Sequence, residues 1–232
     1  MQHTQAVSTR TPVAALGTDS RASFISRTYA HVAMAILGFT LLESYLFSSG
    51  IAEQIVVRVL SVNWLLILGA FMLVSWLATH VALNVESKPL QYAALAAFVV
   101  AEAIIFLPLL YIAVITEPSV IESAASVTLL GAGGLTAVAF ITKRDFSFLR
   151  GMLVWGGILA IVAIIGAVLF GFELGTWFSV AMIGFAGAAV LYDTSNILHH
   201  YPEDRYVAAA LALFASIALM FWYVLRLFMS RD

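Results

Sequence analysis

Seven long apolar segments dominate the pattern of hydrophobic and polar positions along the chain. They cover about residues 28–47, 62–83, 89–115, 120–141, 148–170, 176–198 and 207–228. Each is about 20 residues or longer, which is the length a helix needs to cross the hydrocarbon core of a bilayer. The pattern therefore predicts an all-α membrane protein with seven transmembrane helices. A further apolar stretch at 51–58 is too short to span and is expected to lie along the interface.

The two ends of the chain differ in character. Residues 1–26 are polar and contain no apolar run of the kind found in a secretory signal peptide. We expect a flexible cytoplasmic tail at 1–26, followed by a single seven-helix domain at 27–230. The last apolar segment carries alanines at 208, 209, 210, 212, 215 and 218. Small residues let helices approach closely, so this helix is suited to being surrounded by the others.

Composition narrows the class of protein further. Of the 232 residues, 62% are hydrophobic and 10% are charged, whereas soluble domains have about 45–50% apolar and 25% charged residues. A soluble enzyme and a disordered protein are excluded. The net charge of −2 offers no basic surface, so no nucleic-acid partner is expected. The chain has no cysteine and hence no thiolate metal site or cysteine nucleophile.

Positive charges predict the orientation of the helices. On the side where the chain begins, the predicted topology places Arg10, Arg21, Arg27, Lys88, Lys143, Arg144, Arg150 and Arg205. The opposite side receives Arg58, Arg226 and Arg231. Because cytoplasmic loops carry the excess of lysine and arginine, we expect the N-terminus in the cytoplasm and the C-terminus outside. Short loops and this clear asymmetry favour a bacterial inner membrane.

Four ionisable residues fall within or at the ends of predicted spans, where a charge is costly unless it is paired or hydrated. Asp193 and His31 lie near cytoplasmic ends, and His31 can reach the headgroups. Glu43 either is neutral, or reaches the outer interface, or takes part in transport. Glu102 stands six residues before Pro108, which removes a backbone hydrogen bond of the helix. The Glu102 side chain is therefore expected either to be a protonated carboxyl that is hydrogen-bonded to the freed backbone or to take part in transport.

Known membrane chemistries do not match these residues. No second aspartate lies within a span, as an intramembrane aspartyl protease needs, and no Gly-x-Ser-x-Gly serine motif is present. The last helix lacks the lysine of a retinal protein. The adjacent His199 and His200 point in different directions on a helix and are expected to face the headgroups. We therefore expect neither enzymatic activity nor a bound cofactor, and no metal ligand set can be named.

Several motifs together identify a resemblance. They are Phe24-Ile-Ser-Arg-Thr-Tyr-Ala-His31, Thr142-Lys-Arg-Asp-Phe-Ser-Phe-Leu149, Gly184-Phe-Ala-Gly-Ala-Ala-Val-Leu-Tyr-Asp-Thr-Ser-Asn-Ile-Leu198, and the final segment from Val207 to Leu227. They resemble the Bax inhibitor-1 (TMBIM) family over nearly the whole chain. The sharpest piece is the Tyr-Asp-Thr at 192–194, which is followed by a short loop and an alanine- and leucine-rich last helix.

The resemblance implies a fold and two activities. The last helix would lie at the centre, enclosed by two three-helix layers. Family members are linked to a pH-sensitive calcium leak, and a bacterial branch modulates a membrane-anchored ATP-dependent protease. In the calcium-leak members, two aspartates on the last two helices share a proton and gate the pore. Asp193 matches the first aspartate, whereas counting back ten residues from Arg226 places Ser216 at the second.

Ser216 removes the coupled titration that two close carboxylates would show. It can donate a hydrogen bond to Asp193 but cannot add charge for a divalent cation. Glu43 and Glu102 are candidate replacements for the missing carboxylate, and the candidate partners of Asp193 are His80, His200 and Asn196. Two hypotheses follow: a pH-modulated leak for calcium or other cations with Asp193 at its cytoplasmic constriction, and a non-transporting regulator that binds a membrane partner such as an ATP-dependent protease.

Overall fold

The computed structural model describes residues 11–230, and this part of the chain is helical apart from its turns. The helices are α1 (Thr18–Ser48), α2 (Ile51–Leu60), α3 (Trp64–Asn84), α4 (Lys88–Thr116), α5 (Ser119–Thr142), α6 (Leu149–Phe170), α7 (Gly175–His199) and α8 (Tyr206–Met229). Within residues 11–230, seven helices are long and apolar enough to cross a membrane, and α2 is the helix that is not. The prediction of an all-α protein with seven spans is confirmed.

Local chemistry at the turns sets where several helices begin and end. Gly50 separates α1 from α2 and Gly171 ends α6, each with a positive φ near 70° that favours glycine. The side chain of Asn63 accepts a hydrogen bond from the backbone N–H of Leu65 and so caps the start of α3. Pro89 lies in the first turn of α4, where its missing N–H costs nothing.

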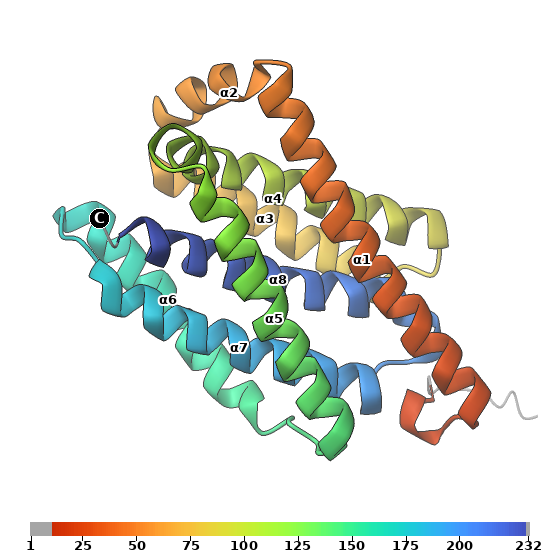
Figure 1. Cartoon of the computed structure of the whole chain (residues 1–232). Coiled ribbons are helices and arrows are strands. Elements are labelled where there is room, and N and C mark those ends of the chain that lie inside the picture. The colour runs from red at the N-terminus through yellow and green to blue at the C-terminus, as the bar shows by residue number, and fades with distance from the viewer. Residues whose placement is uncertain (1–10, 231–232) are drawn as a thin grey trace, which may run out of the picture.

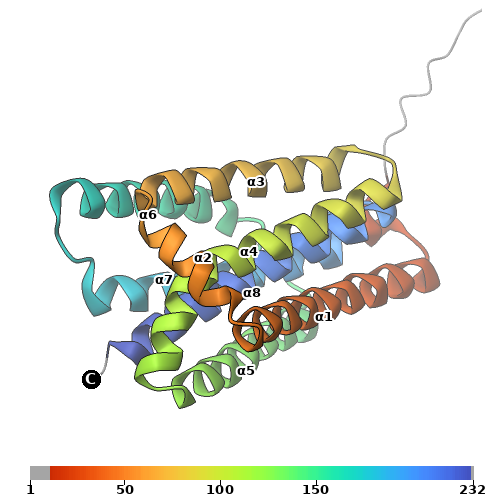
Figure 2. The same ribbon diagram turned by 90° about the horizontal axis from the view of Figure 1, so that it is seen from above.

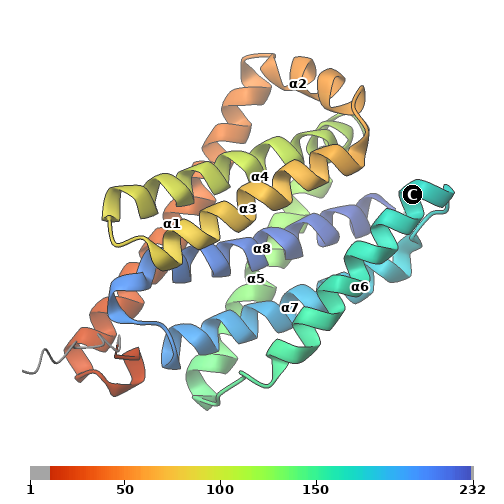
Figure 3. The same cartoon turned by 180° about the vertical axis from the view of Figure 1, so that it is seen from behind.

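Helix α8 lies at the centre of the bundle (Figure 1). On one side α4 packs against both α1 and α3, and on the other side α7 packs against both α5 and α6 (Figures 2 and 3). Helix α8 packs against α1, α3, α4, α5 and α7. In its most apolar stretch 67% of the residues are buried, compared with 6% in α6. The expected central last helix between two three-helix layers is confirmed.

The chain becomes ordered earlier than the sequence suggested. Helix α1 begins at Thr18, about ten residues before the predicted first span. Val13 lies in a short 3-10 turn before the helix and is fully buried, and its N–H donates to the carbonyl of Tyr201 at 2.9 Å. The expectation of a flexible tail therefore does not hold for residues 11–26. Residues 1–10 of the expected tail lie outside the described residues.

This N-terminal segment packs on the loop that joins α7 to α8. Pro12 forms an isolated bridge with Pro202. Farther along, Arg21 donates from Nη2 to the carbonyl oxygen of Leu198 at 3.1 Å, and Phe24 is buried. Because these contacts hold the loop between the two helices that carry Asp193 and Ser216, the segment acts as a strap across one end of the bundle. We call residues 11–17 the N-terminal strap.

Candidate functional site

A hydrogen bond joins α7 to α8 inside the bundle. Ser216 Oγ on α8 donates to Oδ2 of Asp193 on α7 at 2.5 Å, and each residue is only 8% exposed. Hydrogen bonds to a carboxylate are shorter than neutral ones and about twice as strong. The structure thus brings together the two residues that the motif and the spacing from Arg226 single out.

Close packing of α7 on its neighbours explains why the two side chains meet. Gly187 lies two turns before Asp193, and a Cβ added there would come within 3.2 Å of Leu135 Cδ1 on α5. On α8, Ser216 lies between Ala215 and Ile217 in the sequence, and Ala209 and Ala210, about two turns earlier, are fully buried. These small residues let the helix axes approach, so that the short serine side chain reaches the aspartate.

A cluster of hydroxyl groups around Tyr29 lies near Asp193. Tyr29 on α1 lies within electrostatic reach of Asp193, and its hydroxyl is beside those of Thr194 on α7 and Thr136 on α5. In the described part of the chain, the buried hydroxyls of Tyr29 and Thr194 have no hydrogen-bond partner of ordinary geometry. Leaving a buried polar group unsatisfied costs about 1–3 kcal/mol. Buried polar groups without a partner are rare in native proteins, and a functional role is one explanation for them.

The loop between α5 and α6 is tied to the same end of α7. Ser195 Oγ accepts a hydrogen bond from the N–H of Phe146 at 2.9 Å, and His200 Nε2 lies 3.0 Å from Asp145 Oδ2. Asp145 also accepts from the N–H of Ser147. The hydrogen bond from the Ser147 backbone, followed by the contact with His200, lowers the pKa of Asp145 to about 2. Asp145 is therefore ionised at neutral pH and anchors the loop to the residue that follows α7.

The residues expected to pair with Asp193 have other contacts. His200 pairs with Asp145, as above. His80 is exposed on α3, where its ring stacks on Trp76 and its Nδ1 contacts the side-chain amide of Asn84. The backbone carbonyl of Asn196 accepts from the N–H groups of His200 and Tyr201 at the end of α7. Among residues 11–230, the side-chain partner of Asp193 is Ser216 alone, so the structure does not support these three pairings.

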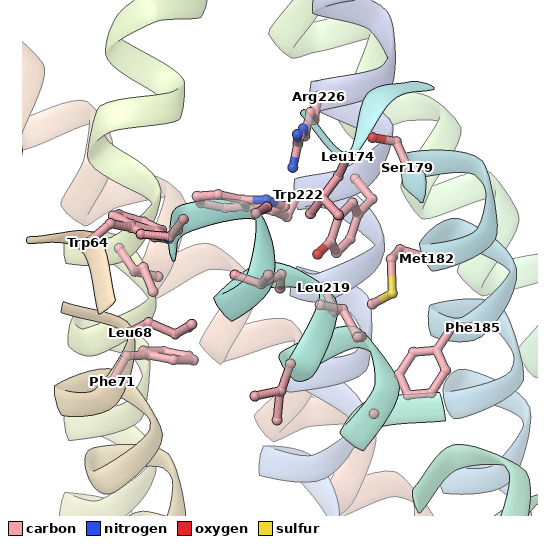
Figure 4. Close-up of a pocket in the computed structure, with 18 of the residues that line it drawn as sticks. Trp64, Leu68, Phe71, Leu174, Ser179, Met182, Phe185, Leu219, Trp222 and Arg226 are labelled. Atoms are coloured by element: carbon pink, nitrogen blue, oxygen red, sulfur yellow. The ribbon is translucent and has the colours of Figure 1, made fainter. Parts of the chain in front are cut away.

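Glu43 and Glu102 lie apart from the Asp193–Ser216 pair. Glu43 is 6% exposed and lines a cavity of about 380 Å³ between α1, α4, α5 and α8, together with Thr128. In the described chain, neither its carboxylate oxygens nor the Thr128 hydroxyl have a hydrogen-bond partner. Glu102, also 6% exposed, lines a different cavity of about 940 Å³ between α3, α4, α6, α7 and α8 (Figure 4).

Asp193 and Ser216 line neither cavity. The sequence-based suggestion that Glu43 or Glu102 replaces the second aspartate is therefore not supported, because neither carboxylate contacts Asp193. Within residues 11–230, no three histidine, aspartate or glutamate side chains are close enough to hold a metal ion together. A cation that reached Asp193 would meet one carboxylate and a set of hydroxyl oxygens.

Two features of the site were missed from the sequence. Tyr29 was not singled out, because a tyrosine near the end of a span is common and nothing local indicates where its hydroxyl points. Arg205 was treated as one more cytoplasmic charge, yet it is 1% exposed and donates from Nη1 to the carbonyl of Val85 at 2.6 Å. This bond ties the start of α8 to the loop between α3 and α4.

His31 has an aromatic environment. Its ring stacks on Tyr92 with the centroids 5.5 Å apart and lies 5.2 Å from the ring of Tyr206. The two tyrosine hydroxyls are 2.6 Å apart. The histidine thus packs between α4 and α8 at the end where α8 begins and lies apart from the Asp193–Ser216 pair.

Comparison with known proteins supplies the family. The family model for the inhibitor of apoptosis-promoting Bax1 matches residues 21–232. A BI1-like protein of Arabidopsis thaliana is 33% identical over 125 residues, which are 50% of this chain and 48% of that protein. An uncharacterized membrane protein of Vibrio cholerae is 32% identical over 119 residues, 50% of this chain and 52% of that protein.

A modulator of FtsH protease, YccA of Escherichia coli, is 31% identical over 100 residues, which are 42% of this chain and 45% of that protein. The matched part thus spans about half the length of these curated relatives. The family model, in contrast, covers nearly the whole chain, including both Asp193 and Ser216. This chain is an integral membrane protein that belongs to the Bax inhibitor-1 family.

Proposed function

We propose that the protein is a cation leak, permeable to calcium and modulated by protons, with its constriction at the Asp193–Ser216 pair. The observation that carries the proposal is a buried aspartate whose bond to Ser216 joins α7 to the central helix. Ionisable residues inside a membrane domain are costly and usually mark ion or proton pathways. We assign no catalytic activity and no resident cofactor to the protein.

The chemistry of the pair suggests how the leak is controlled. An ionised Asp193 attracts a cation, and the bond from Ser216 holds α7 and α8 together in the closed arrangement. A cation that passes must displace this hydroxyl. Protonation of Asp193 removes the charge, so flux is expected to be lower at pH 6 than at pH 8. With one carboxylate instead of two, flux should follow a single titration step.

Calcium flux into liposomes that contain the purified protein tests the proposal. We expect flux at pH 8 to exceed flux at pH 6, and Asp193→Asn to remove both the flux and its pH dependence. Asp145→Asn is the matched control, because Asp145 is an exposed aspartate outside the pair. Unchanged flux in Asp193→Asn, or no flux from folded wild-type protein, would contradict the proposal.

The likeness to YccA supports a second candidate function. That relative is named as a modulator of FtsH protease, so this chain is a candidate regulator of a membrane protease of the same kind. Ser216 is compatible with this role, because a regulator needs no coupled carboxylate pair. Co-purification with such a protease, together with no calcium flux, would favour the regulator. Flux that depends on Asp193 without any co-purification would favour the leak.

We also propose a bacterial inner-membrane location, with the N-terminus in the cytoplasm and the C-terminus outside. The excess of lysine and arginine at the end of the bundle where α1 and α8 begin supports this orientation. Because the chain has no cysteine, a single introduced cysteine can report on which side of the membrane its loop lies. Ser61→Cys should react with a membrane-impermeant thiol reagent added to intact cells, whereas Ser87→Cys should react only after the cells are opened. The reverse result would invert the orientation.

A further inference from the structure

The larger cavity lies in the half of the bundle where α3 begins and α8 ends. Its volume is about 940 Å³, at the upper end of the ~300–1,000 Å³ typical of small-molecule sites. Its walls come from α3, α4, α6, α7 and α8, and α3 and α6 contact each other only slightly. Trp64, Phe71, Leu219 and Trp222 give it a mainly apolar lining (Figure 4). A cavity of this kind suits an apolar chain.

Polar groups gather at one end of this cavity. Figure 4 shows Arg226 and Ser179 at that end, above Trp222 and Met182. Ser179 is 2% exposed, and it lines the cavity from α7. Among residues 11–230, the half-buried guanidinium of Arg226 forms no ion pair. Glu173, in the turn before α7, also lines the cavity. The guanidinium of Arg226 and the hydroxyl of Ser179 are the groups at the mouth of this apolar cavity that can donate hydrogen bonds to an anionic group.

The register of α4 against α8 gives the depth of the cavity. Phe98 contacts Phe214, and Phe106 contacts Trp222. Glu102 is midway between the two phenylalanines and is therefore level with about residue 218 of α8. Arg226 lies about eight residues farther along, which is roughly 12 Å at 1.5 Å per residue. The cavity thus runs from the end of α8 to the middle of the bundle.

The aromatic rings locate the mouth relative to the bilayer. Trp64 begins α3 and stacks on Trp222 with the ring centroids 6.4 Å apart. Tryptophan is enriched at the level of the headgroups, where its ring has one apolar and one hydrated side. Arg226, one turn beyond Trp222, therefore lies at the depth of lipid phosphates. Charge, depth and lining together favour a lipid over a soluble solute.

We propose that this cavity binds a phospholipid with an anionic headgroup, with its phosphate at Arg226 and Ser179 and one acyl chain along Trp222 and Leu219. Basic pockets between transmembrane helices are a known way to recognise anionic lipid headgroups. The site is separate from the Asp193–Ser216 pair, so it does not depend on whether the protein conducts ions. It makes the lipid a resident partner of the half of the bundle where α8 ends.

Native mass spectrometry of the detergent-purified protein tests whether the cavity prefers a lipid with an anionic headgroup. Phosphatidylglycerol is the anionic probe and phosphatidylcholine the zwitterionic one. We expect phosphatidylglycerol to bind more tightly, and Arg226→Gln to weaken its binding about tenfold. Arg58→Gln is the matched control, because Arg58 is on α2 and does not line the cavity. Equal binding of the two lipids, or phosphatidylglycerol binding unaffected by Arg226→Gln, would overturn the proposal.

A second pair of variants tests the acyl-chain path. Ile164→Trp fills the cavity from α6, which is the least buried span and so tolerates a larger side chain. Leu159→Trp adds the same ring to an exposed position on α6 that does not line the cavity. We expect only Ile164→Trp to displace the lipid. Lipid binding that is lost in Glu102→Gln but kept in Ile164→Trp would also overturn the proposal, because it would indicate a hydrated polar site.

Discussion

Replacing Ser216 with alanine removes the only described side chain that donates to Asp193. The bond is 2.5 Å long and buried, and a hydrogen bond to a charged acceptor contributes about 1.5–3 kcal/mol. If the closed arrangement has this bond and the open one does not, the ratio of open to closed protein rises by about 10- to 150-fold, since 1.36 kcal/mol is a factor of ten. We therefore expect Ser216→Ala to leak calcium faster than the wild type at pH 8.

The assay is the initial rate of calcium entry into liposomes, measured beside the thermal unfolding temperature in detergent. Thr28→Val is the control, because Thr28 is fully buried and its hydroxyl donates to Phe24 within α1. This control should lower the unfolding temperature without raising the leak. A folded Ser216→Ala protein that leaks no faster than the wild type would refute the reasoning that the bond holds the pathway closed.

Three further predictions concern the strap, the loop and the tail. Val13→Asp places an unpaired charge in a fully buried position and should lower the unfolding temperature by several degrees, whereas the exposed neighbouring variant Ala14→Asp should not. Because the hydrogen bond from the Ser147 backbone, followed by the contact with His200, lowers the pKa of Asp145 to about 2, these contacts of the carboxylate stabilise the fold above about pH 4, and the stabilisation is lost as the pH falls towards 2. The pair is exposed and contributes at most about 1 kcal/mol, so Asp145→Asn should lower the unfolding temperature slightly at pH 7 and less at pH 3. Deleting residues 2–23 removes Val13 and its contact with Tyr201, and should lower the thermal unfolding temperature.

The number and type of helices could be predicted because hydrocarbon imposes them. A chain in a bilayer must satisfy its backbone hydrogen bonds internally, so each long apolar stretch becomes a helix. The start of α1 could not be predicted in this way. Residues 18–26 are mostly polar and belong to a helix extension whose contacts, such as that of Arg21 with Leu198, involve the end of α7, far away in the sequence. Hydropathy carries no information about such contacts.

The candidate site was predictable only in part. The resemblance to the Bax inhibitor-1 family identified Ser216, because it implies a second site residue ten positions before Arg226 in the last helix. The partners of Asp193 on other helices were not predictable, since they depend on how the helices pack. His200, two turns along the same face as Asp193, turned out to pair with Asp145 in another loop. Glu43 and Glu102 resembled spare carboxylates, yet their helices direct them into separate cavities.

The most direct test of the central claim is the ratio of calcium flux at pH 8 to calcium flux at pH 6, measured for wild type and Asp193→Asn in the same liposomes. We predict a ratio above one for the wild type, and for the variant a flux near that of protein-free liposomes at both pH values. An identical flux and an identical ratio in Asp193→Asn would contradict the assignment of Asp193 as the constriction.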